Sequence, residues 1–363
     1  MVEQAATTSP VRRWSPGLAV KVVLSLVLVV AIFWYLLKGI DLGQVRAEIT
    51  SMTWLELATL TAIALWNLMT YAFVWMSVTP GLSFWRAMTM TQSTTAVANT
   101  VPVVGAPIGV GMTYGMLGSW GYSRSRTTTA VLVSGVWNSF IKLGIPVLAV
   151  ALVALQGNAS GSRVTLALAG IGGLVAAVVV FALMLRSERV AERVGVLAGR
   201  ATSRLLRLVG RGPVTGWELA TVKFRSRTVD LLEHRWLPIT AATLVSHLSL
   251  YVVLLITLRH VGVSNAEVSW AEVLAVFAFA RLATAIPFTP GGVGVVEAVL
   301  IGGFVTAGGD RAEVVAAVLV YRALTWGLPI LVGAGTYLWW RRRAMRTPTH
   351  EQATPSEVGV AAP

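Results

Sequence analysis

A motif rich in proline and glycine interrupts apolar sequence twice, and it constrains the fold more than any other feature. Proline cannot continue an α-helix and glycine weakens one. Within a membrane, such broken backbone is tolerated only where protein buries it or where it lines a water-filled cavity. Interruptions at corresponding positions of two halves point to the binding site of a transporter. The first copy contains Pro102, Gly105, Pro107, Gly109 and Gly111, and the second contains Pro287, Pro290, Gly291, Gly292 and Gly294.

The composition places the chain in a membrane. Hydrophobic residues make up 55% and charged residues 12%, which is far from the balance of a soluble domain. We predict an all-α polytopic membrane protein with about six full spans and two broken hairpins. The first span follows basic residues and has no small-residue cleavage site after it, so we interpret it as a retained span. Apolar segments of spanning length lie near 18–37, 54–78, 127–155, 164–185, 237–258 and 313–340, and the broken regions near 87–118 and 271–308.

The distribution of charge predicts the topology. The net charge is +13, but the basic residues cluster at the ends of apolar spans, which favours anionic lipid as a partner over nucleic acid. The segment 186–235 holds eleven Lys and Arg against five acids and should be cytoplasmic, together with both termini. All strongly basic segments fall on that side only if each broken region enters and returns, as a re-entrant hairpin or as two full crossings.

Two units, 54–155 and 237–340, share the order helix, broken hairpin, helix, and the predicted topology inverts one relative to the other. The four residues from Ala130 recur from Ala317, and these segments lie 187 positions apart, while Pro102 and Pro287 lie 185 apart. We therefore predict inverted repeats within a membrane domain, 16–347. The segment 186–235 between them forms either amphipathic helices or a solvated loop. Residues 1–15 and 348–363 are expected to be disordered.

Charged groups at membrane depth are the first candidates for a site, because an unpaired charge there costs about 3 kcal/mol or more. Glu297 follows the second motif, and Arg281 and Arg322 flank it, so these three are expected to pair around the second hairpin. A role facing the substrate and a static clamp between Arg281 and Glu297 both remain open. The first half offers Asn99, just before its break, and Lys142 in the next span. His247 is expected to be a buried histidine with its hydrogen bonds satisfied.

Several kinds of chemistry find no support in the sequence. The chain has no cysteine, which excludes disulfides and thiol chemistry. It has no Gly-x4-Gly-Lys-Ser/Thr, His-Glu-x-x-His or Gly-x-Ser-x-Gly motif, and no cluster of mid-membrane carboxylates. We therefore expect neither catalytic residues nor a metal or other cofactor.

The second motif and its surroundings resemble the lysylphosphatidylglycerol synthase transmembrane, or flippase-like, family over about 18–340. The resemblance rests on the segment from Ile286 to Glu297, on Tyr321 and Arg322 with the residues after them, and on Leu328 and Pro329. It implicates Pro287, Pro290, Gly291, Gly292, Gly294, Glu297, Tyr321 and Arg322, with Asn99 and Pro102 in the first half. The Gly-Glu pair that often ends the family's first motif is absent, because Met112 stands opposite Glu297. The family's soluble aminoacyl-transfer domain is absent too, so lysyl transfer is not expected.

The combined prediction is a stand-alone lipid translocase in the cell membrane. It would move an anionic or aminoacylated phospholipid, or a polyprenyl-phosphate-linked lipid, between leaflets. The substrate-binding candidates are Glu297, Arg281, Arg322, Tyr321, Asn99 and Lys142. One alternative is an accessory protein or enzyme that works with a protein partner in lipid-linked glycan or cell-envelope assembly. A second alternative is an ion-coupled transporter of a small solute.

Overall fold

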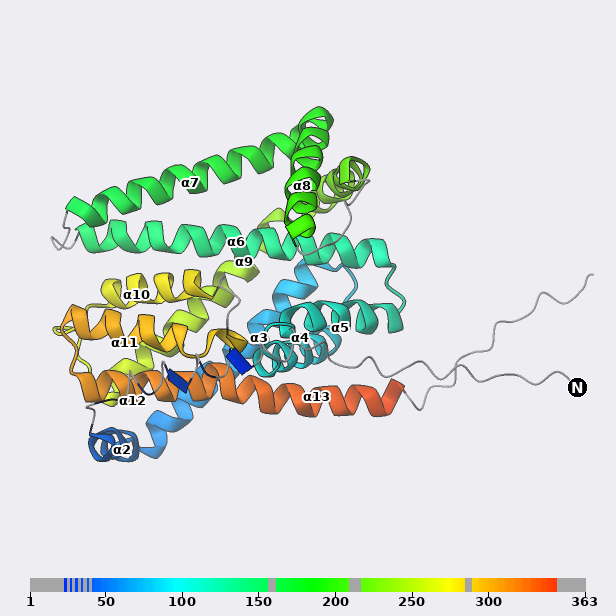
Figure 1. The fold of residues 1–363 in the computed structure, drawn as a ribbon. Helices are drawn as coiled ribbons and strands as arrows, with labels where there is room; N and C mark the ends of the chain where they lie inside the picture. Colours follow the sequence, from blue (N-terminus) through cyan, green and yellow to red (C-terminus); the bar gives the residue numbers. More distant parts are fainter. Residues whose placement is uncertain are drawn as a thin grey trace, which may run out of the picture.

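The described part of the protein is helical throughout (Figure 1). The structure, a computed structural model, describes residues 41–155, 161–208, 217–284 and 289–344, together with isolated positions between 23 and 38. Both predicted tails and most of the first predicted span therefore lie outside the described residues.

Two runs of helices follow the order predicted for the repeats. The first, which follows α2 (Leu42–Ser51), consists of α3 (Trp54–Val78), α4 (Phe84–Thr100), α5 (Gly105–Ser119) and α6 (Arg124–Leu155). The second consists of α9 (Trp217–Val261), α10 (Trp270–Ala283), a 3₁₀ turn η1 (Pro290–Gly292), α11 (Val295–Ala307), α12 (Arg311–Arg322), a π-helix η2 (Ala323–Gly327) and α13 (Leu328–Ala344). Between the runs lie α7 (Gly161–Arg186) and α8 (Glu188–Leu208).

Long apolar helices confirm that the protein is integral to a membrane. Four stretches of the described chain are long and apolar enough to cross a bilayer: Trp54–Val78, Arg124–Val153, Thr221–Val261 and Arg311–Arg343. The helix α7 has 26 residues and so is also of spanning length. The span predicted at 237–258 is the second part of α9, a helix of 45 residues that begins well before it.

The four hairpin helices are shorter than a typical membrane span. The helices α4, α5, α10 and α11 have 17, 15, 14 and 13 residues, and a span needs about 20. In Figure 1, α4 and α5 lie at the end of the bundle where α13 finishes, and α10 and α11 lie at the opposite end. The turn of the second hairpin meets the end of α4 near the middle, where Gly291 lies close to Asn99.

The two ends of the bundle differ in charge. The end where α4 begins and α13 finishes, called here the basic end, carries Arg86, Arg124, Arg126 and Arg341 to Arg343. The opposite end, called the acidic end, carries Glu48, Glu56, Glu267, Glu272, Asp310 and Glu313. At the basic end, the segment after α7 forms the amphipathic helix α8, which buries Ala191 and Ser203 and exposes arginines. Of the two alternatives for this segment, the described residues therefore adopt the helical one.

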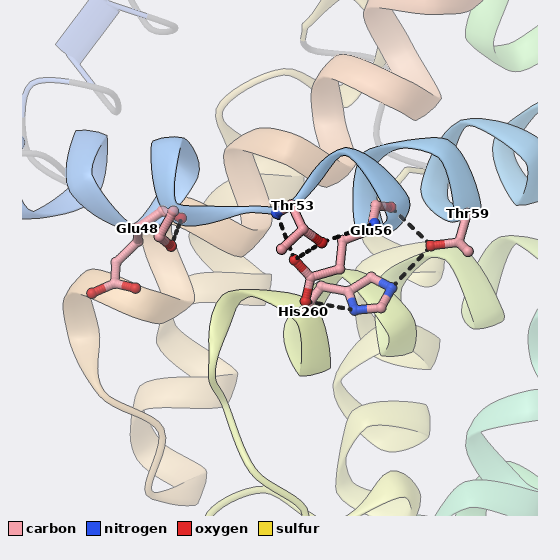
Figure 2. Close-up of polar contacts among 6 residues, drawn as sticks. Glu48, Thr53, Glu56, Thr59 and His260 are labelled. Atoms are coloured by element: carbon pink, nitrogen blue, oxygen red, sulfur yellow. Dashed lines mark hydrogen bonds and ion pairs between the residues drawn. The ribbon is translucent and has the colours of Figure 1, made fainter.

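Side chains join the two runs along α3 and α9. At the acidic end, Glu56 caps α3 by accepting a hydrogen bond from Thr53 N at 2.7 Å, and its other oxygen lies 3.6 Å from His260 Nδ1 of α9 (Figure 2). The His260 Nε2 atom lies 3.2 Å from Thr59 Oγ1. Deeper in the bundle, the buried Asn67 donates to Ser249 Oγ at 2.6 Å. These contacts hold α3 against α9.

Candidate functional site

The second hairpin turns through glycines whose backbone conformation other residues rarely adopt. Gly291, Gly292 and Gly294 have φ of 60°, 71° and 88°. A Cβ on Gly291 would lie 2.6 Å from Trp326 Nε1 and 3.0 Å from Asn99 Oδ1, so the turn also passes closely between η2 and α4. Gly291 therefore lets the second hairpin meet the first. Pro290 begins the 3₁₀ turn, whereas Pro287 lies outside the described residues.

A buried ion pair fastens this turn to α12. Glu297 is 3% exposed, and its two oxygens accept hydrogen bonds from Arg322 Nε and from the backbone N–H of Gly294, each at 2.7 Å. Arg322 Nη2 also donates to the carbonyl oxygen of Gly291 at 3.2 Å. Glu297 is thus a structural clamp, and its partner is Arg322.

Arg281, on the last turn of α10, lies outside that clamp. It makes no ion pair within the described part of the chain, and its Nε is buried there without a hydrogen-bond partner. The predicted clamp between Arg281 and Glu297 is therefore not formed, because Glu297 pairs with Arg322 instead. Lys142 of α6 donates to Thr284 Oγ1 at 3.3 Å, one residue past the end of α10, and it is close enough to Arg281 for the two charges to repel.

Where the two hairpins meet, they and the helices α3, α9, α12 and η2 enclose a cavity of about 130 Å³, called here the central cavity. It is much smaller than the 300–1,000 Å³ pocket of a drug-sized ligand, so it suits a small polar group rather than a whole lipid. Two donors at its wall, Arg281 Nε and Trp326 Nε1, have no acceptor among the residues the structure describes. Unsatisfied buried donors call for an acceptor-rich occupant. The polar lining consists of Tyr71, Thr95, Asn99, Arg281, Thr284, Tyr321, Arg322, Thr325 and Trp326.

The first motif contributes to packing, and its residues do not line the central cavity. Gly105 and Gly109 let α5 approach α4, because Cβ atoms there would lie 2.8 Å from Val97 O and 3.1 Å from Thr94 O. Gly111 has no such neighbour within 4 Å. Pro102 lies in the break, and Pro107 lies in the first turn of α5, where its missing N–H costs no helical hydrogen bond.

The sequence candidates therefore divide between the cavity and its supports. Asn99, Arg281, Tyr321, Arg322 and Gly291 line the central cavity, Lys142 lies beside it, and Glu297 holds the turn. Sequence reasoning missed Tyr71, Thr284 and Trp326. A signal existed for Trp326. Pro329 has no N–H to donate to the Thr325 carbonyl, and a lost helical hydrogen bond favours a widened turn such as the π-helix η2, which contains Trp326. Tyr71 on α3 gave no comparable signal.

His247 of α9 is only half-satisfied. Its Nε2 lies 2.8 Å from Asn138 Oδ1 of α6, but its Nδ1 is buried without a partner in the described chain. The expectation of a fully satisfied core histidine therefore does not hold.

Comparison with known proteins agrees with this architecture. A search of curated proteins finds no match for the chain. A family model described as the lysylphosphatidylglycerol synthase TM region matches residues 22–333, which include both hairpins and every described residue of the central cavity. By this match, the chain belongs to the lysylphosphatidylglycerol synthase TM region family.

Proposed function

We propose that the protein is a lipid translocase whose central cavity receives an anionic headgroup. The observation that carries the proposal is Arg281, a cation inside the bundle whose buried Nε lacks an acceptor among the described residues where the hairpins meet. Membership of a lipid-related membrane family supports a lipid as the substrate.

The charge balance of the site supports an anion. Among the described residues, Arg281, Arg322 and Lys142 lie at or beside the central cavity with one carboxylate, Glu297, which Arg322 already neutralises. A cation left unpaired at this depth costs about 3 kcal/mol. A headgroup phosphate would relieve this cost, because its oxygens accept charge-assisted hydrogen bonds from guanidinium and ammonium groups.

The arrangement of the hairpins supports movement between leaflets. If the two runs of helices are inverted repeats, rocking one against the other would open the cavity to each side in turn. By the positive-inside rule, we expect the basic end to face the cytoplasm. In this account the protein binds and moves lipid, and it carries out no covalent step.

Headgroup-resolved flipping in proteoliposomes tests the proposal. Wild type should flip labelled phosphatidylglycerol or a polyprenyl phosphate faster than phosphatidylcholine. Arg281→Gln should slow that flipping at least tenfold, and Arg281→Lys should restore part of it. The matched control, Arg124→Gln, removes an exposed arginine at the start of α6 and should flip at the wild-type rate. Flipping by Arg281→Gln at the wild-type rate, or none by folded wild type, would overturn the proposal.

A further inference from the structure

Two more openings with polar side chains in their walls lie along α3, α6 and α9, between the central cavity and the basic end. The outer one is a groove of about 490 Å³, called here the basic groove, whose charged lining is Arg126, Arg227, Asp230, His234 and Arg235. The inner one is a cavity of about 250 Å³, called here the middle cavity, with Ser134, Asn138, Thr243, Ser246 and His247 in its wall. Tyr71 lines both the middle and the central cavity, so the two are adjacent.

One face of α3 connects the three openings, because Tyr71 lines the central and middle cavities, Val74 and Trp75 line the middle cavity, and Val78 lines the basic groove. Ser125 and Thr129 line the basic groove, Ser134 and Asn138 line the middle cavity, and Lys142 reaches Thr284 beside the central cavity. At 1.5 Å per residue, these α6 residues follow the order of the openings over about 25 Å of the helix axis, although they do not share one face of α6. The helix α9 repeats the order with Asp230, His247 and Leu250.

The middle cavity offers hydrogen bonds without fixed charge. His247 and Asn138 meet across it, and His247 Nδ1 has no partner there among described residues. Gly135 also lines this cavity and is exposed, and a Cβ on it would meet nothing within 4 Å. The cavity is therefore open toward the side of the bundle at Gly135, where acyl chains could remain in the lipid.

An apolar layer separates the middle cavity from the basic groove. Val78, Ala130, Val133 and Ile239 are buried in one cluster, and Trp75 packs against them. Val78 also lines the basic groove and Trp75 the middle cavity, which places the cluster between the two openings. We call it the apolar gate.

We propose that this row of openings is a gated passage along which an anionic headgroup moves between the membrane surface at the basic end and the central cavity. The inference rests on the proposed function and names its route. Among its described charges, the basic groove has three arginines and one carboxylate. The middle cavity has uncharged hydrogen-bond donors and acceptors, and Lys142 and Arg281 lie at the inner end of the passage. Such an order attracts an anion and repels a cation at both ends of the passage.

Thiol accessibility tests the passage without requiring transport. Because the chain has no cysteine, an introduced one is its only thiol. Ser134→Cys should react with an anionic, membrane-impermeant methanethiosulfonate added at the basic end. Adding Val133→Ala and Ile239→Ala, which thin the apolar gate, should speed that reaction at least tenfold. Leu132→Cys, on an exposed position of the same helix, is the control and should stay unreactive. A Ser134→Cys that remains unreactive with the gate thinned would refute the passage.

A matched pair at Gly135 identifies what moves through it. Gly135→Ala should flip lipid at the wild-type rate, since its methyl group meets only open space. Gly135→Phe should fill the middle cavity and reduce flipping at least tenfold, with its unfolding temperature close to that of wild type. Flipping by Gly135→Phe at the wild-type rate would overturn the passage and leave the proposed function standing. A reactive Ser134→Cys in a wild-type background that flips no lipid would refute the proposed function and the headgroup as occupant.

Discussion

The hairpins α4–α5 and α10–α11 have similar lengths and meet at the same cavity, yet they are held together differently. In the first, Gly105 and Gly109 bring the helices together, and its described contribution to the cavity is the uncharged pair Thr95 and Asn99. In the second, an ion pair between Glu297 and Arg322 fixes the turn, and Arg281 makes no ion pair among the described residues. The comparison suggests that α4–α5 supplies an uncharged wall of the cavity. The hairpin α10–α11 supplies Arg281 and also Glu297, whose ion pair holds the turn in place.

The largest expected effect comes from breaking the clamp. Arg322→Ala would leave Glu297 buried without its cation, and removing one partner of a buried pair typically costs about 3–5 kcal/mol. Thermal unfolding in detergent should show a large fall in Tm. The matched change in the first hairpin, Thr113→Val, removes only a local hydrogen bond to Gly109 O and should cost about 1 kcal/mol. Equal losses in the two variants would contradict the contrast between the hairpins.

A smaller effect is expected from the turn glycines. Gly291→Ala imposes a left-handed φ on alanine, at about 1–3 kcal/mol, and drives its methyl group toward Trp326. Gly111→Ala in the first motif meets open space and should be neutral or stabilise by up to about 1 kcal/mol, as in other helices. Chemical unfolding of the two variants measures both values. A stable Gly291→Ala protein would show that the close meeting of the hairpins is not needed.

The smallest effect is expected where the first hairpin touches α13. Ser93 Oγ lies 3.1 Å from Thr336 Oγ1, and a neutral hydrogen bond of this kind contributes about 1 kcal/mol. A double-mutant cycle of Ser93→Ala and Thr336→Val should give a coupling energy near that value. No measurable coupling would mean that packing alone joins α4 to α13.

Much of the helix order was predictable because apolar length, proline and glycine each limit what a segment can do. The two hairpins follow from the motifs, and the order within each run follows from the spans. The length of α9 was not predictable from hydropathy, since Arg235 and Pro238 mark a boundary in composition that the helix crosses. Proline at the start of an apolar stretch usually signals a helix start.

The candidate site was only partly predictable. Arg281, Glu297 and Arg322 were predictable because a charged residue within an apolar span is a candidate site residue in any membrane protein. Which arginine pairs with Glu297 depends on how the turn approaches α12, a three-dimensional relation that spacing does not encode. Tyr71 reaches the cavity for the same reason, through the packing of α3 against α9.

The most direct test of the central claim is lipid-dependent stabilisation of Arg281 variants. A short-chain phosphatidylglycerol would be titrated into detergent-solubilised wild type and Arg281→Gln, with short-chain phosphatidylcholine as the control lipid, and Tm followed. A ligand that binds the folded state raises Tm as its concentration passes its Kd. The account predicts that phosphatidylglycerol raises the Tm of wild type and leaves that of Arg281→Gln at its phosphatidylcholine value. Equal shifts in the two proteins would contradict the claim that Arg281 receives the headgroup.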